Sequence, residues 1–155
     1  MIDHAVRVRR SLVVGVQTRV CAVPLKHVVE TMRPLPVESV AGMPSFVRGV
    51  SIIRGVPTPV VDLGAVLGAP SNAFERIVTL RLSDRQVALA VNAVLGVRDL
   101  DLSVIQELPP LLGGASTDLI EAIGTLDEQF LMVLRAGWEL PDEVWRALAA
   151  QELAS

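Results

Sequence analysis

The chain contains few of the residue types on which enzymes and metal sites depend. Among its 155 residues it has one cysteine, two histidines and no tyrosine, and aromatic residues make up 3%. Nucleophilic catalysis needs a nucleophile with a base in reach, but a predicted strand and turn separate Cys21 from His27. Zinc requires clustered ligands, and His4 and His27 are far apart. We therefore expect no enzyme activity, no metal and no cofactor, and we interpret Cys21 as a small core residue.

Positive charge is scarce too, and it does not gather into a large patch. The 14 lysines and arginines are outnumbered by 17 acidic residues, for a net charge of −3. The only basic cluster is formed by Arg7, Arg9 and Arg10, whereas nucleic-acid-binding domains normally have a basic face and aromatic side chains for base stacking. No apolar run approaches the roughly 18 residues of a membrane-spanning helix, and the N-terminus lacks a signal-peptide pattern. The sequence predicts a cytoplasmic protein with no nucleic-acid partner and no direct membrane insertion.

Short apolar runs rich in valine are abundant, and hydrophobic residues make up 51% of the chain. Branched side chains fit a pleated, half-buried surface, so these runs favour strands over helices. Four hairpins are predicted, with arms at Leu12–Val16 and Val20–Leu25, Phe46–Ile53 and Val56–Val61, Ile77–Leu82 and Gln86–Val91, and Leu119–Leu126 and Phe130–Leu134. Val94–Asp99 is interpreted as a further strand and Leu108–Gly114 as a loop.

Helices are predicted to be short except at the C-terminus. Lys26–Met32 is interpreted as a helical turn that ends before Pro34. Asp62–Leu67 is predicted to form a short helix with Asp62 as its N-cap, because a carboxylate oxygen accepts from the free backbone amides of the first turn. Pro141–Leu153 is predicted to form the terminal helix, since proline suits the first turn and two acidic residues follow it.

The hairpins fall into two similar pairs, which indicates an internal repeat. The apolar positions of Val13–Val29 match those of Val78–Leu95 when one extra residue is allowed in the second turn, and those of Val50–Gly64 match Ile123–Gly137. Small β units close into barrels because closure removes exposed edges. We therefore predict two similar small barrels packed on each other. Chance similarity between apolar hairpins is the alternative interpretation.

Two arrangements of residues suggest a binding function. Arg54 lies at the turn of an apolar hairpin and Glu30 follows the first hairpin, so a small barrel can bring the two side chains together. A buried pair would make both residues essential, whereas a solvated turn arginine would contribute little. Gly49 and Gly55 mark a bulge, a positive φ or a close backbone approach. Gly49, inside an apolar strand, indicates either a surface where a partner lies close or a kink at a barrel corner.

Several of these segments resemble the CheW family, the scaffold proteins of bacterial chemosensory arrays. The run FVRGVSIIRGVPTPVVDLGAVLG at Phe46–Gly68, preceded by Met43-Pro44, is similar to the family's most recognisable segment, with Gly55, Asp62 and Leu63 at motif positions. Val28-Val29-Glu30 resembles the family's V-x-E segment, and Val87–Val97 resembles a later valine-rich segment. Together the similar segments extend from about Leu12 to Leu140.

The resemblance implies an all-β fold of two SH3-like five-stranded barrels with short helices and a C-terminal helix. It implies one domain over residues 1–155, structured from about residue 12, with halves at about 12–68 and 74–140. The implied function is that of a non-enzymatic adaptor that couples the cytoplasmic tip of a chemoreceptor to the regulatory domain of a CheA-type histidine kinase, with other CheW-like proteins as further candidate partners. The receptor tip would lie in a groove between the barrels, and the implied groove residues are Val28, Gly49, Val94 and Val97. Arg54 would pair with Glu30 and shape the surface beside that groove.

The chain departs from the family pattern at two positions. The aspartate of the family's V-D segment is Asn92 here, and the aspartate of the last strand is replaced by Arg135. These changes alter the charge of the second barrel, so the alternative is a module that binds only the receptor in a non-standard pathway such as gliding or pilus motility. A generic interaction module with partners outside chemotaxis and a barrel that binds a small ligand are the other hypotheses.

Overall fold

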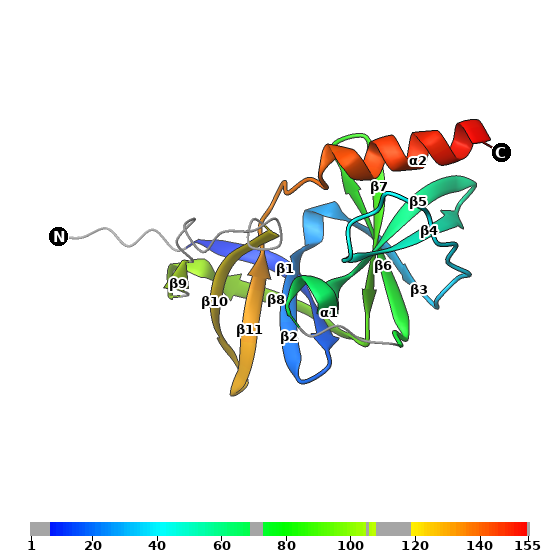
Figure 1. Cartoon of the computed structure of the whole chain (residues 1–155). Helices are drawn as coiled ribbons and strands as arrows, with labels where there is room; N and C mark the ends of the chain where they lie inside the picture. Colours follow the sequence, from blue (N-terminus) through cyan, green and yellow to red (C-terminus); the bar gives the residue numbers. More distant parts are fainter. Residues whose placement is uncertain (1–6, 69–72, 105, 108–118, 155) are drawn as a thin grey trace.

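The computed structural model describes residues 7–68, 73–104, 106–107 and 119–154. Figure 1 shows two β units side by side, with the C-terminal helix lying along the second. The strands are β1 (Val8–Val16), β2 (Arg19–Pro24), β3 (Val28–Met32), β4 (Val47–Ile53), β5 (Val56–Asp62), β6 (Arg76–Leu82), β7 (Arg85–Val91), β8 (Ala93–Asp101), β9 (Gln106–Glu107), β10 (Ile120–Leu126) and β11 (Gln129–Leu134). The helices are η1 (Leu25–His27), α1 (Leu63–Val66), η2 (Leu102–Val104) and α2 (Asp142–Ala154).

The strands form two sheets, and each sheet takes strands from both halves of the sequence. Sheet A has the order β8-β1-β2-β11-β10-β9, and sheet B has the order β3-β6-β7-β5-β4. In each sheet one parallel pair, β2 with β11 or β5 with β7, joins strands from different halves. The predicted all-β class, with short helices and a C-terminal helix, is confirmed. Sheet A carries, beyond five strands, the two-residue strand β9.

The strand pairing supports the predicted repeat and corrects its alignment. Ala22 pairs with Val133 in sheet A, and Ala88 pairs with Val60 in sheet B, so positions matched in the sequence hold matching places in the two sheets. Val13 also pairs with Ala22, but the partner of Ala88 is Thr79 and not Val78. The extra residue allowed in the second turn was therefore wrong. Both hairpins have turns of equal length, whose first residues, Gln17 and Ser83, have the same φ of 58°.

One central cluster of buried side chains spans both sheets. It contains Val14 and Cys21 of sheet A together with Val61 and Leu80 of sheet B, and these side chains are at most 1% exposed. Two smaller clusters lie within the individual sheets. The two sheets therefore pack on each other through one shared cluster of buried side chains, as in other close-packed protein interiors.

One predicted helical turn is largely a strand. Only Leu25–His27 is helical, as a single 3-10 turn, and Val28–Met32 is β3. β3 pairs with β6, with Val28 opposite Leu80 and Met32 opposite Ile77. Val28, Val29 and Thr31 are β-branched, and the open edge of β6 supplies backbone partners that no local pattern reveals.

The other helix predictions agree with the structure. Asp62 is the N-cap of α1, and its Oδ1 accepts from the Ala65 amide at 3.2 Å. In α2 two acidic residues occupy the first turn, and Val144 and Leu148 are buried. The predicted loop Leu108–Gly114 lies outside the described residues.

Candidate functional site

The turn between β4 and β5 holds Arg54 beside β3. Arg54 and Gly55 have φ of 53° and 77°, the left-handed pair that a two-residue hairpin turn needs. From this turn the Arg54 guanidinium donates to both carboxylate oxygens of Glu30, Nε to Oε1 at 3.0 Å and Nη2 to Oε2 at 3.2 Å. The hydrogen bond to Glu30 and its negative charge raise the pKa of Arg54. The predicted contact is confirmed, and it is the solvated form, since the Arg54 side chain is 75% exposed.

The motif residue Asp62 makes a second connection in addition to its cap. Its Oδ2 lies 3.3 Å from Nη2 of Arg48, and the Arg48 guanidinium stands 5.0 Å from the centre of the Phe74 ring. The next residue, Leu63, is 1% exposed in the central cluster. Asp62 and Leu63 therefore hold α1 and the end of β5 in place, and neither offers an accessible contact surface.

Val28 and Val94 hold equivalent places on the two edge strands, β3 and β8. Both are partly buried and pack against the central cluster. Their exposed neighbours on these strands are Val29, Leu95 and Val97, at 50%, 56% and 51% exposed. Of these three, the sequence analysis identified Val97 alone. The other two were missed. Val29 directly follows Val28 and Leu95 directly follows Val94, so each lies on the opposite, solvent-facing side of its strand.

A hollow of about 560 Å³ joins the end of β3 to the start of β8. Val94 and Ala93 line it, together with Arg33, Arg76 and Asn92. Val94 is the one predicted groove residue that reaches this hollow. Its walls are more polar than the apolar groove that the family resemblance implies.

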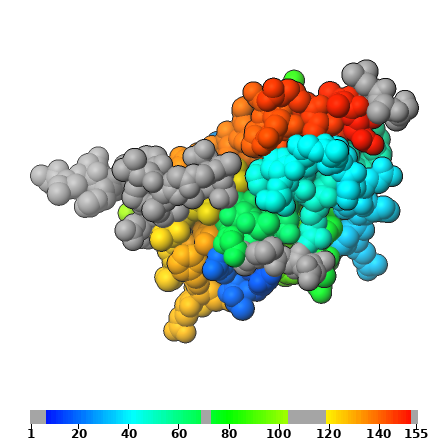
Figure 2. All heavy atoms as spheres, in the orientation of Figure 1, coloured from blue at the N-terminus to red at the C-terminus, as the bar shows by residue number. Residues whose placement is uncertain are grey.

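Gly49 requires a correction. It is buried, with φ of 149°, and a Cβ built on it would lie 2.0 Å from the carbonyl oxygen of Glu38. Glu38 lies beside the edge strand β4 in an antiparallel bridge, in which the backbones of Glu38 and Val50 exchange hydrogen bonds at 2.9 and 2.8 Å. Figure 2 shows the segment leading into β4 (cyan) directly below α2. The close backbone approach is therefore made by this chain itself, and Gly49 is not available to line a groove for a partner.

The two departures from the family pattern differ in role. Asn92 Oδ1 accepts from the Gln17 amide at 2.8 Å, and Asn92 Nδ2 donates to the Ala73 carbonyl at 3.4 Å. An aspartate there could accept but not donate, so the amide suits both partners. Arg135 is exposed, and its backbone amide donates to the Leu119 carbonyl at 2.7 Å.

The described residues contain no group of three or more histidine, cysteine, aspartate or glutamate side chains placed to hold a metal ion. Within that same part of the chain no helix is long and apolar enough to span a membrane. Burial raises the pKa of the Cys21 thiol to about 12, which makes it a poor nucleophile at neutral pH.

Two sheets that exchange strands between the halves of the sequence define an all-β protein of the barrel class. The sequence pattern of the CheW-like domain family matches residues 10–137, and the chain belongs to this family. The chemotaxis protein CheW of Klebsiella aerogenes is 24% identical over 121 residues, which cover 76% of this chain and 68% of that protein. The crystal structure of the scaffolding protein TtCheW from Thermoanaerobacter tengcongensis matches with a TM-score of 0.69 and 21% identity, over 86% of this chain and 98% of that one. The chain is thus a non-enzymatic adaptor of the chemotaxis class, as the sequence predicted.

Proposed function

We propose that this adaptor couples the cytoplasmic tip of a chemoreceptor to a CheA-type histidine kinase in a bacterial chemosensory complex. The observation that carries the proposal is the exposure of apolar side chains on the equivalent edge strands of the two sheets, Val29 on β3 and Leu95 and Val97 on β8. A helical hairpin docks through an apolar stripe, and such a stripe needs apolar side chains that water can reach in the free protein. The proposal places the chain in the cytoplasm, associated with the membrane through receptor arrays.

The receptor contact that we propose lies along β3 and β8. Val28 and Val94 form its rigid base because they pack against the central cluster, while Val29, Leu95 and Val97 supply the contact area. The ion pair of Glu30 with Arg54 stands on β3 within this surface and orients the hairpin turn beside it. Gly49 has no part in this contact.

For the kinase regulatory domain we propose the face of the β4–β5 hairpin. Ile52 is 62% exposed there, and it lines a hollow together with Leu35, which is 37% exposed. A cluster of this kind indicates a protein contact more strongly than scattered apolar residues do. Phe130, 45% exposed on the corresponding hairpin of sheet A, is the candidate contact for a second kinase domain or another CheW-like protein.

A crossed pair of substitutions tests the two contacts separately. Val97→Asp places a charge on the β8 surface, and Ile52→Asp places the same charge on the β4–β5 hairpin. Receptor-containing membranes and a purified CheA-type kinase are each tested for binding by co-sedimentation or pulldown. We expect Val97→Asp to weaken receptor binding at least about tenfold and to spare kinase binding, and Ile52→Asp to do the reverse, because each buries a charge in only one contact.

Each outcome decides between the hypotheses. If both variants bind both partners as the parent chain does, the assigned surfaces are wrong. If the parent chain binds receptor but no CheA-type kinase, the receptor-only module of a non-standard pathway is the correct interpretation. If it binds neither, the coupling function is wrong and a partner outside chemotaxis takes its place.

A further inference from the structure

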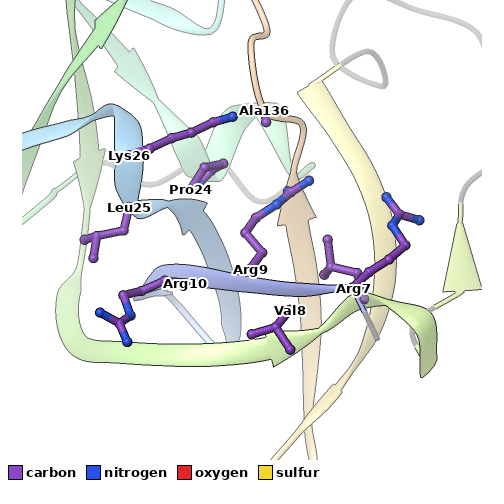
Figure 3. Close-up of a pocket in the computed structure, with 9 residues that line it drawn as sticks. Arg7, Val8, Arg9, Arg10, Pro24, Leu25, Lys26 and Ala136 are labelled. Atoms are coloured by element: carbon purple, nitrogen blue, oxygen red, sulfur yellow. The ribbon is translucent and has the colours of Figure 1, made fainter. Parts of the chain in front are cut away.

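A pocket of about 670 Å³ lies where the start of β1 meets η1, and four cationic side chains surround it. Arg7, Arg9 and Arg10 come from β1 and the residue before it, and Lys26 comes from η1. Figure 3 shows Lys26 and Arg9 both extending toward the segment that holds Ala136. None of the residues that line this pocket is acidic. The basic cluster of the sequence therefore contributes to a cavity whose own walls do not neutralise it.

Neighbouring acids hold the three arginines in place. Arg9 Nη2 lies 2.8 Å from Glu121 Oε2, while Nη1 of the same arginine donates to the Leu134 carbonyl at 3.1 Å. Arg10 Nε donates to Asp99 Oδ1 at 3.0 Å, and Arg7 lies 3.7 Å from Glu121. These contacts pre-organise the arginines and offset part of their charge.

Lys26 differs from the arginines around it. Within the described part of the chain no hydrogen bond or ion pair involves its ammonium group, and the residue is exposed. An ammonium group has three donors and no acceptor, so it is suited to a carboxylate or phosphate from outside the chain. Lys26 is also the only lysine in the sequence.

The rest of the pocket is apolar. Val8 is 58% exposed, which leaves a valine side chain open to water beside the cations. Leu25 and Leu102 extend the apolar wall, and Leu102 is 6% exposed. Cavities of roughly 300–1,000 Å³ that combine apolar walls with a few polar groups are typical of binding sites.

We propose that this pocket binds a segment of a partner protein in which acidic and aliphatic side chains alternate. A carboxylate of the segment binds the Lys26 ammonium, on the side of β1 to which Arg9 also extends (Figure 3), and an aliphatic side chain packs on Val8 and Leu102. A small anion would satisfy the cations but leave the apolar wall uncovered. The site goes beyond the proposed receptor and kinase contacts, since none of its lining residues belongs to those surfaces.

Three synthetic peptides test the proposal on the full-length chain. The first is a capped, fluorophore-labelled heptapeptide of alternating leucine and glutamate, the second has glutamine for each glutamate, and the third has serine for each leucine. We expect the first to bind in fluorescence anisotropy, and the other two to bind at least about tenfold more weakly, because a charge-assisted hydrogen bond and an apolar contact are each worth about that factor. Equal binding of the first two peptides, or of the first and third, would overturn the proposal.

Matched substitutions locate the binding. Lys26→Met is expected to weaken the first peptide about tenfold and Val8→Ser several-fold, whereas Arg81→Met, which removes the same charge from an exposed position on β6, is expected to leave affinity within about twofold. Equal effects of Lys26→Met and Arg81→Met would show that only net charge attracts the peptide, and the pocket assignment would then be wrong. Thermal melts of each variant confirm that the fold persists.

The single lysine allows a direct readout. Acetylation of the Lys26 amine by an amine-reactive ester, followed by mass spectrometry with the N-terminal amine as an internal reference, is expected to slow at saturating concentrations of the first peptide. Succinate and inorganic phosphate, tested in the same assay, are expected to protect far less. Protection by these anions equal to that by the peptide would replace the proposed segment with a plain anion site.

Discussion

Arg54 and Asp127 occupy the same place in the two repeats, each at the first position of a two-residue turn, and their charges are opposite. Their φ values are 53° and 50°. Arg54 pairs with Glu30 on β3 at 3.0 Å, while Asp127 pairs with Arg98 on β8 at 3.1 Å. In both sheets an ion pair thus joins a hairpin turn to the edge strand, with reversed polarity. The two edge strands therefore carry charges of opposite sign at equivalent places, which makes the proposed receptor contact along β3 and β8 asymmetric in charge.

Reversing one charge of the sheet A pair tests this relationship. Asp127→Arg brings two arginines together and is expected to lower the free energy of unfolding by up to about 1 kcal/mol, because Arg98 and Asp127 are both solvated. Adding Arg98→Asp is expected to restore most of the loss. Urea unfolding at low and high salt measures the coupling, which should shrink in 1 M salt as screening increases. A coupling unaffected by salt would show that the pair does not act electrostatically.

The crowding at Gly49 predicts a large effect from a single methyl group. Gly49→Ala is expected to destabilise the fold by about 2–4 kcal/mol, because the new Cβ would meet the Glu38 carbonyl and φ is unfavourable for alanine. Gly55→Ala is the matched control: φ is positive there too, but a Cβ would have nothing within 4 Å. Its expected cost is about 1 kcal/mol. Similar denaturation midpoints for the two variants would contradict the close approach of the Glu38 backbone to Gly49.

The two roles of Asp62 can be separated by substitution. Asp62→Asn keeps an oxygen to cap α1 but removes the charge that faces Arg48, whereas Asp62→Ala removes both. We expect Asp62→Ala to cost about 1 kcal/mol more than Asp62→Asn in equilibrium unfolding, which is the usual worth of an N-cap. If the asparagine variant were as unstable as the alanine variant, the ion pair with Arg48 would be the dominant contribution.

Cys21 predicts how stability changes at alkaline pH. Its pKa is about 12 in the folded chain against an ordinary value of 9.0. Between these values the unfolded chain loses a proton that the folded chain keeps, so the free energy of unfolding falls as pH rises above about 9. The full effect is on the order of 4 kcal/mol. Below about pH 9 the Cys21 thiol does not change how the free energy of unfolding depends on pH.

Comparing the parent chain with Cys21→Ala isolates the thiol. Unfolding free energies measured at pH 8, 9.5 and 10.5 are expected to fall more steeply for the parent, since other alkaline titrations are common to both proteins. The slope is the readout, because the substitution also changes packing. Parallel pH profiles would show that the thiol ionises as easily in the folded chain as in the unfolded one.

Much of the local structure was predictable because it depends on residues close in sequence. Branched apolar runs predict the arms of the hairpins, and the acidic residue before Leu63 predicts the cap of α1. The contact of Arg54 with Glu30 was predicted as well, from the position of each residue at the end of a hairpin unit. The short turn after β2 was mistaken for a longer helix because Val28–Met32 has no strand partner nearby in the sequence.

The candidate surfaces were less predictable because they depend on which distant segments of the chain come into contact. Gly49 is a strand glycine in the sequence, and whether a partner or the chain itself approaches it depends on the path of Glu38. Likewise Arg7, Arg9 and Arg10 are only a basic cluster until η1 brings Lys26 to the same cavity.

Alternation, turn residues and caps in this chain specify its hairpins, its short helices and a repeated β unit, since each of these forms through contacts within a few residues. Three features arise only on folding: the exchange of strands between the halves, the central cluster that spans both sheets, and the choice of exposed side chains. The pairings of β2 with β11 and of β5 with β7 join segments far apart in the sequence. They are stabilised by the burial of apolar surface between those segments, which no pattern of neighbouring residues predicts.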